Sequence, residues 1–206
     1  MLLRIISQRK VDRTKMNLEA LIERWRAGDQ RAAESIYNQH REQTFRLAYG
    51  LLGNTEDAEE VAQDALTYAL LHIHHFDERR SKFTTWLYMI TVSRSRDIMR
   101  KRRLPTFSLT AWLQNRQSPS DSRPGPEQRV TENETRKSVW DAIQDLSPDL
   151  REATTLRHWG GLTYQEIAEI TGCTMKTAQS RVRLAHQKLV RILGEVDFQQ
   201  SAEETR

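Results

Sequence analysis

Apolar residues recur along the chain every three or four positions, which is the period of a helix with one buried face. In residues 163–193 this pattern is divided by Gly172, which stands where a first helix must end. Thr163 and Glu166 have the spacing of a capping box at the start of that helix, and Thr174 can cap the next one. We therefore predict two helices around a tight turn, the second running to about residue 193. The inner face of the first comprises Ile167, Ala168 and Ile170.

The remaining pattern predicts more amphipathic helices and no strand, so the predicted fold class is all-α. Further helices are expected at residues 18–27, 30–52, 56–73, 84–103, 128–146 and 148–159. The predicted N-caps are Asn17, Asp29, Asn54 or Thr55, Thr84 or Thr85, and Ser147, which precedes Pro148 in a first turn. The predicted ends are Gly28, Gly53, the pair Gly160–Gly161, and Gly194.

A change of composition divides the chain into two small helical domains. Residues 105–127 contain four of the five prolines and lose the helical period, which is typical of a flexible linker. The predicted organisation is an N-terminal extension at 1–16, a first domain at 17–103, the linker at 104–127, and a second domain with a polar tail at 128–206. Either Met1 or Met16 is the expected start.

Basic residues gather on two of the predicted helices, in a chain with a net charge of +4 and a sequence pI near 9.4. One group lies on the helix after Gly172. The other group lies on the helix predicted at 84–103, where Asp97 is the single acid. It consists of Arg94, Arg96, Arg100, Lys101, Arg102 and Arg103. So many positive charges at one helix end favour phosphate contacts over helix-dipole or solubility effects alone.

A short helix, a glycine turn and a basic second helix are typical of a helix-turn-helix, whose second helix enters the DNA major groove. An ordinary helical hairpin with a solvated basic face fits the same residues less well. Because each half of the chain carries a basic helix, we expect it to grip two separated stretches of one duplex, provided that the linker spans them.

Other functional classes lack the residues that they need. The sequence holds no P-loop, no GxSxG and no HExxH, so neither enzymatic activity nor a cofactor is expected. His72, His74 and His75 do not share one helix face and are expected to be polar helix-end residues rather than a metal site. Cys173 is alone and no apolar run could span a bilayer, so we expect no disulfide, no membrane insertion and a cytoplasmic location.

The helix predicted at 56–73 is strongly acidic between Glu56 and Asp64. Carboxylates in a first turn suit the helix dipole and can simply be solvated. They can equally form a surface for a basic helical partner, and the pattern alone does not choose.

Several stretches resemble a known family. LSPDLREATTLRHWGGLTYQEIAEITGCTMKTAQSRVRLAHQKL resembles the C-terminal domain of extracytoplasmic-function (ECF) sigma factors of the sigma-70 family. LEALIERWRAGDQRAAESIYNQH, NTEDAEEVAQDA and FTTWLYMITVSRSRDIMRKRR resemble the N-terminal domain of that family, in the same order. Together they cover most of residues 18–193.

The resemblance implies a bacterial transcription initiation factor that binds core RNA polymerase and directs it to promoters. It implies a polymerase contact at Asp57, Glu60, Val61, Gln63 and Asp64. It implies that loop 77–83 and the next helix read the −10 element and capture an unstacked base, with contacts from Arg79, Arg80, Lys82, Trp86, Ser93, Arg94, Arg96, Arg100 and Arg103. It implies −35 contacts from Thr174, Lys176, Thr177, Gln179, Ser180, Arg181, Arg183 and Lys188. The alternative is a two-domain regulator that binds DNA without joining the polymerase.

Some residues depart from the family pattern. Ser93 stands where the family usually carries asparagine, and its shorter side chain lacks the two-headed amide. Gln179 stands where a basic residue is frequent, and Leu184 and His186 stand at positions of arginine. Because glutamine favours adenine whereas arginine favours guanine, we expect a −35 preference different from the usual family element.

The resemblance also implies an anti-sigma partner. Such an inhibitor can cover the acidic helix or hold the two domains in an unusable spacing. The flexible linker permits the second route, because it offers little resistance to packing the domains together. The free chain is expected to reach a compact inactive state in the same way, with Trp112 and Leu113 as candidates to close it.

Overall fold

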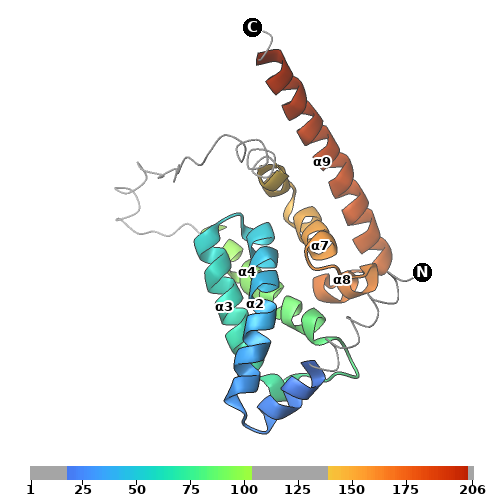
Figure 1. Ribbon diagram of the computed structural model, residues 1–206. Coiled ribbons are helices and arrows are strands. Elements are labelled where there is room, and N and C mark those ends of the chain that lie inside the picture. The colour runs from blue at the N-terminus through green and yellow to red at the C-terminus, as the bar shows by residue number, and fades with distance from the viewer. Residues whose placement is uncertain (1–17, 104–138, 204–206) are drawn as a thin grey trace, which may run out of the picture.

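The computed structural model describes residues 18–103 and 139–203, and the side chains of residues 18–102 and 139–193. The described residues form helices joined by short turns, with no strand among them, which confirms the all-α fold class. Figure 1 shows two groups of helices lying against each other, with the last helix projecting beyond both. We name residues 18–103 the N-terminal bundle and residues 139–193 the C-terminal bundle. The predictions for Asn17, Trp112, Leu113 and the linker lie outside the described residues.

The N-terminal bundle consists of a helix at residues 18–26, α2 (Gln30–Leu52), α3 (Thr55–Leu71), the short 3-10 turn η1 (Ile73–His75) and α4 (Phe83–Arg103). Asp29 caps α2 by accepting a hydrogen bond from the backbone N–H of Arg31, and Gly53 ends α2 with a φ of 68°. Asn54, rather than Thr55, caps α3, because its side chain accepts from the backbone N–H of Asp57 at 2.9 Å.

The start of α4 differs from the prediction. The helix begins at Phe83, so Thr84 and Thr85 lie inside it and neither is its N-cap. Thr85 is 1% exposed, and its hydroxyl donates to the carboxylate of Glu166 in the C-terminal bundle at 3.2 Å. The local pattern misplaced the start because Thr85 makes a tertiary contact that the pattern cannot reveal.

The C-terminal bundle consists of a helix at residues 139–144, α7 (Pro148–His158), α8 (Tyr164–Thr171) and α9 (Met175–Glu203). Ser147 and Pro148 open α7 as predicted, although the Ser147 side chain makes no capping hydrogen bond. The predicted end of α9 at Gly194 is wrong, since the helix continues to Glu203. A glycine ends a helix when it adopts a positive φ, as Gly53 and Gly172 do, and Gly194 remains helical.

The two bundles share one hydrophobic core. Helix α2 packs against α7, and α4 packs against α8. Fully buried residues of both bundles belong to the same cluster, among them Leu47, Leu87, Leu156 and Ile167. The rings of Tyr49 on α2 and Trp140 before α7 meet edge to face, with centroids 4.8 Å apart. The C-terminal bundle is therefore seated on the N-terminal bundle rather than held at a distance from it.

Candidate nucleic-acid interface

The turn between α8 and α9 has the local geometry that the sequence predicted for a helix-turn-helix. The Thr163 hydroxyl accepts from the backbone N–H of Glu166 at 3.2 Å, and the Glu166 carboxylate accepts from the backbone N–H of Thr163 at 2.8 Å. Gly172 ends α8 with a φ of 68°. The Thr174 hydroxyl accepts from the backbone N–H of Thr177 at 3.1 Å and caps α9. These local bonds fix the angle at which α9 leaves α8.

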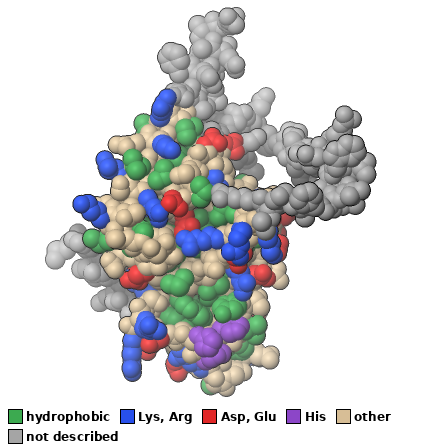
Figure 2. Space-filling model, turned by 180° about the vertical axis from the view of Figure 1, so that it is seen from behind, with side chains coloured by type: hydrophobic (Ala, Val, Ile, Leu, Met, Phe, Trp, Pro, Cys, Tyr) green, Lys and Arg blue, Asp and Glu red, His purple; other side chains and the backbone are tan. Residues whose placement is uncertain are grey.

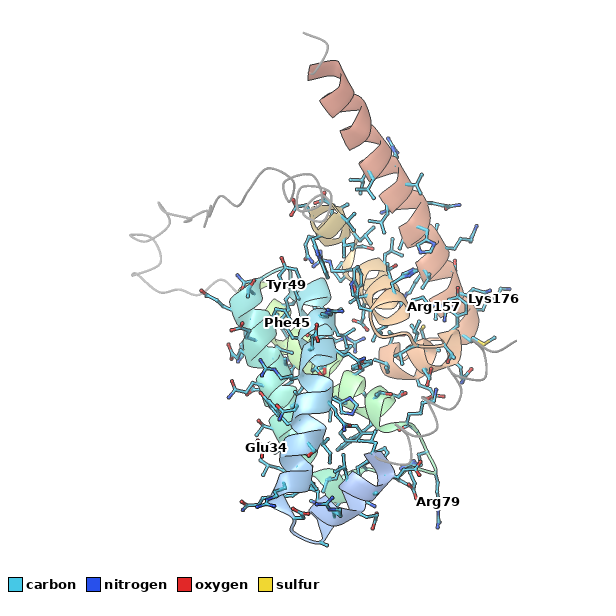
Figure 3. All side chains as sticks on the ribbon, in the orientation of Figure 1. Glu34, Phe45, Tyr49, Arg79, Arg157 and Lys176 are labelled. Atoms are coloured by element: carbon cyan, nitrogen blue, oxygen red, sulfur yellow. The ribbon has the colours of Figure 1, made fainter. Side chains whose placement is uncertain are left out.

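Helix α9 has one buried face and one exposed face. The inward positions follow helical spacing, are at most 3% exposed, and are Ala178, Val182 and Ala185. Lys176, Gln179 and Arg183 are exposed on the other side of the helix. Figure 3 shows Lys176 pointing away from the body of the protein at the start of α9. A polar, basic helix face of this kind fits the DNA major groove.

Some of the predicted −35 residues are engaged within the protein. Arg181 donates to Asp149 of α7 at 2.6 Å, and its side chain is 24% exposed. Thr177 is half-buried, with its hydroxyl 2.9 Å from that of Thr174. These contacts hold α9 in place. Ser180 is half-buried beside them, whereas Lys188 is exposed farther along the helix.

Leu184 and His186 make the outer part of α9 less basic than arginines would. Leu184 is 42% exposed. The Nε2 atom of His186 lies 2.7 Å from the Nε2 atom of His158 on α7, so one ring donates to the other. Burial, together with the neighbouring His186 and Arg157, lowers the pKa of His158. The pair thus joins α9 to α7 without adding a fixed positive charge.

Helix α4 carries a second polar line. Ser93, Arg96 and Arg100 follow one another at spacings of three and four residues and are exposed. Met89, 42% exposed, extends the line toward the start of the helix. Arg100 also donates to Asp97 at 2.8 Å on the surface. The line offers two guanidinium groups and a hydroxyl to a nucleic-acid strand.

Arg94 lies apart from this line. Its guanidinium carbon is 5.2 Å from the ring centroid of Tyr68 on α3, and its side chain is half-buried. Such a cation–π contact anchors α4 to α3. The side chain of Arg103, another predicted contact, lies outside the described residues.

The loop between η1 and α4 packs on a cluster of aromatic rings. The rings of Phe76, Phe83 and Trp86 lie with centroids 5.5 to 5.9 Å apart, and Trp86 is only half-buried among them. Arg79 and Arg80 are exposed on the loop, and Figure 3 shows Arg79 extending away from the bundle. The loop therefore combines positive charge with a rigid aromatic support.

Two carboxylates of the C-terminal bundle bind basic residues of the N-terminal bundle. Arg96 donates two nitrogens to the carboxylate of Glu152, one of them Nε at 3.0 Å from Oε2, and Glu152 is 7% exposed. Lys82 donates to Glu166 at 2.9 Å. Burial alone would raise the pKa of Glu166, but hydrogen bonds from Thr163 and Lys82 lower it to about 2. Neither pair could be predicted from the sequence, since the partners are 56 and 84 residues apart.

The acidic start of α3 is mostly solvent-facing. Glu60, Gln63 and Asp64 are exposed. Asp57 is half-buried and pairs with Arg102 of α4. Val61, predicted as a contact, is 1% exposed and lies in the core. Its position indicates that it supports α3 from within.

The three neighbouring histidines lie together just after α3. The ring centroids of His72, His74 and His75 are 4.2 to 6.2 Å apart, and Figure 2 shows histidine side chains beside a hydrophobic patch on that face. In the described parts of the chain, no three His, Cys, Asp or Glu side chains are arranged to hold a metal ion. None of the described helices is long and apolar enough to cross a bilayer.

Comparison with known proteins matches both bundles to sigma factors. Residues 36–104 match Sigma-70 region 2, and residues 136–189 match Sigma-70, region 4. The RNA polymerase sigma-H factor of Pseudomonas aeruginosa is 30% identical over 181 residues, covering 85% of this chain and 93% of that protein. The ECF RNA polymerase sigma-E factor of Escherichia coli is 31% identical over 176 residues, covering 83% of this chain and 91% of that protein.

Solved structures share the fold. CnrH, solved in complex with the cytosolic domain of CnrY, has a TM-score of 0.62 at 22% identity and covers 87% of this chain and 98% of its own. RpoE of Bartonella quintana, solved with the anti-sigma factor NepR, has a TM-score of 0.60 at 24% identity and covers 78% of this chain and 96% of its own.

The described residues form helices that include a helix-turn-helix and a second exposed basic helix, and this arrangement fits a DNA-binding protein of transcription. With both of its bundles matched, and with relatives at 30% identity over most of its length, this chain belongs to the ECF RNA polymerase sigma factors of the sigma-70 family. Its function is to direct RNA polymerase to promoters. The alternative, a regulator that acts without the polymerase, is not favoured.

Proposed function

We propose that this sigma factor reads the −10 element with the N-terminal bundle and the −35 element with the helix-turn-helix. The observation that carries the proposal is that α4 and α9 each expose a polar, basic face opposite a buried one. Two such faces on one chain suit the two separated elements of a promoter. The protein works by binding alone, without an enzymatic step or a cofactor, and acts in the cytoplasm.

The −35 element is read by the exposed face of α9. Lys176, Gln179 and Arg183 reach base edges, while Lys188 contacts phosphate farther along the helix. Thr174, Thr177, Ser180 and Arg181 lie close to the turn or to α7, and they position the helix on the DNA backbone. The glutamine favours an adenine at one position of the element.

The −10 element is read by the line on α4 and the loop before it. Ser93, Arg96 and Arg100 follow the strand, and Arg79 and Arg80 contact phosphates from the loop. An unstacked base costs a few kcal/mol to extrude, and aromatic and apolar contacts compensate for it. The half-buried Trp86 offers such a surface.

Core RNA polymerase binds the exposed polar face of α3, formed by the acids Glu60 and Asp64 together with Gln63. CnrH was solved with the cytosolic domain of CnrY, and RpoE was solved with the anti-sigma factor NepR. By analogy, this chain has an anti-sigma partner that prevents the polymerase contact.

The test is co-purification with a bacterial core RNA polymerase, followed by transcription from a randomised promoter library. Charge reversal at Glu60 and Asp64 together should abolish co-purification and leave helical circular dichroism unchanged. The matched control is Glu42→Lys, which reverses an exposed acid on α2 and breaks a surface pair with Arg46. Specific promoter binding by a wild-type chain that fails to join the polymerase would contradict the proposal, as would full binding by the double variant.

A further inference from the structure

Two imidazole rings converge at the surface where α7 lies beside α9 (Figure 1). The Nε2 atom of His158, the last residue of α7, lies 2.7 Å from the Nε2 atom of His186 on α9, and the ring centroids are 4.8 Å apart. Both residues are exposed, so solutes can reach the two nitrogens. Imidazole nitrogens are common ligands of transition-metal ions, and here two of them meet from different helices.

Packing of the two helices holds these rings in place. Val182, one turn before His186, is 3% exposed, and Thr154, one turn before His158, is 2% exposed. Both rings therefore project from helices that are fixed by their buried neighbours. Ligands carried by packed helices keep their geometry better than ligands on loops.

The distance between the two nitrogens indicates the geometry that an ion would adopt. Two nitrogens bound at about 2.0 Å with an angle of about 90° are about 2.8 Å apart, whereas a tetrahedral angle separates them by about 3.3 Å. The observed 2.7 Å is close to the first value. Tetragonal coordination by nitrogen and oxygen is typical of Cu²⁺ and Ni²⁺.

The charges around the pair leave room for a cation. Burial, together with His186 and Arg157, lowers the pKa of His158, so its ring is neutral at pH 7, and neutral imidazole is the form that binds metal. The Arg157 guanidinium is engaged elsewhere: it donates to the backbone oxygen of Leu162 at 2.7 Å and lies 4.7 Å from the ring centroid of Tyr164.

Binding of an ion requires a change of tautomer and no net loss of a proton. In the free chain one Nε2 carries a hydrogen and donates it to the other. When an ion binds, that hydrogen leaves Nε2 and a proton is taken up at Nδ1 of the same ring by exchange with water. Both Nε2 lone pairs then face the ion.

We propose that His158 and His186 bind one divalent transition-metal ion, Ni²⁺ or Cu²⁺, which joins α9 to α7 and keeps water at its other coordination positions. The proposal is independent of the DNA and polymerase contacts proposed above. An ion that spans both helices binds only while they are packed together, so it stabilises the folded chain. Because α9 is the second helix of the helix-turn-helix, the ion fixes that helix on its support.

The test uses Ni²⁺ as the probe and the full chain without an affinity tag. Every chain carries Cys173→Ser, so that the single thiol of the sequence cannot bind the ion. His158→Gln and His186→Gln each remove one ligand from the exposed pair. Titration calorimetry measures binding, and circular dichroism measures the melting temperature with and without Ni²⁺.

The matched control removes the other histidine cluster. It is the triple variant His72→Gln, His74→Gln and His75→Gln, which leaves the pair between α7 and α9 unchanged. The reference chain and the triple variant should each bind Ni²⁺ at this pair, with a melting temperature that rises as the logarithm of the ion concentration.

Loss of either ring of the pair should weaken Ni²⁺ binding about 100-fold or more, because the second ligand binds an ion that is already held close to it. The rise in melting temperature should disappear as well. Melting without Ni²⁺ separates this effect from the hydrogen bond that each substitution removes. Equal Ni²⁺ binding in His158→Gln or His186→Gln would overturn the proposal, as would binding that is lost in the triple variant. Binding without a rise in melting temperature would also overturn it.

Electron paramagnetic resonance with Cu²⁺ provides a direct count of the ligands. In the triple variant the spectrum should show hyperfine structure from two nitrogen nuclei, and adding His158→Gln or His186→Gln should reduce it to one. A spectrum of the hydrated ion in the triple variant would overturn the proposal. None of these measurements involves polymerase or a promoter, so failure of the metal site and failure of the promoter-reading function are observed separately.

Discussion

The two helices proposed to read DNA, α4 and α9, reach the surface in different ways. Helix α9 rests on α7 and α8 through one buried row of residues, with half-buried residues beside it and an exposed face opposite. Helix α4 is enclosed by α2 and α3 on one side and by α8 on another. Its Thr85, Thr91 and Ser95 are buried at 0 to 1% exposure. The difference indicates that the exposed face of α9 is accessible as the chain stands, whereas Lys82 and Arg96 of the α4 side are engaged by carboxylates of the same chain.

The largest effect should come from the core that joins the two helices. Ile167→Ala on the α9 side and Leu87→Ala on the α4 side each remove a side chain that is 0% exposed. Each should cost about 2–5 kcal/mol of unfolding free energy. Because both residues belong to one cluster, thermal denaturation followed by circular dichroism should show a single transition that either variant lowers.

Two transitions, each moved by only one of these variants, would break this picture. The bundles would then unfold independently, and the shared core would contribute little to stability.

Low pH should destabilise the protein through His40, a residue of α2 that packs against the start of α4. Its ring is 7% exposed and packs 5.2 Å from the ring of Phe83, the first residue of α4. Burial lowers the pKa of His40 from 6.5 to about 4. Between these values the unfolded chain binds a proton that the folded chain does not. The free energy of unfolding is therefore highest above about pH 6.5, and it falls by about 3 kcal/mol as the pH drops to 4.

The measurement is urea unfolding at several pH values. His40→Leu should flatten the pH dependence of the unfolding free energy between pH 6.5 and 4, because it removes the titrating ring. The substitution breaks no hydrogen bond, since neither ring nitrogen has a partner among the described residues. His158→Gln on the α9 side is the control and should retain most of the slope. An equally steep slope in His40→Leu would assign the acid sensitivity elsewhere.

The contrast between α4 and α9 also separates what the sequence could predict from what it could not. The helix-turn-helix follows from local chemistry: Thr163, Glu166 and Gly172 act within four residues of the atoms that they bind. The long-range pairs Arg96–Glu152 and Lys82–Glu166 leave no local signal, because each partner satisfies an ordinary helical pattern by itself.

Two predicted helix boundaries are wrong for related reasons. The predicted starts of α4 assumed that a threonine before an apolar run acts as a cap, yet Thr85 binds Glu166. The predicted end at Gly194 assumed a positive φ that the helix does not require. The polymerase contact at Val61, which the resemblance implies, stays a prediction, and the residue is 1% exposed in the core.

Base reading by α9 should produce a smaller, sequence-dependent effect. Gln179→Ala should cost about 1–3 kcal/mol of promoter binding and relax the preference at one −35 position. Lys188→Ala should weaken all sequences alike and reduce the salt slope by about 1. A randomised-promoter selection with the reconstituted holoenzyme measures both. An unchanged −35 preference in Gln179→Ala would exclude this residue from base reading.

The smallest expected effect compares a helix cap in each bundle. The Asn54 side chain accepts from the backbone N–H of Asp57 at 2.9 Å, so Asn54→Ala should cost about 1 kcal/mol. Ser147 holds the corresponding position before α7 but makes no such bond, and Ser147→Ala should change stability by less than about 0.5 kcal/mol. If the bundles unfold together, urea titration reports both variants on the same transition. An equal loss in both would mean that Ser147 does cap α7 in solution, which would remove this difference between the bundles.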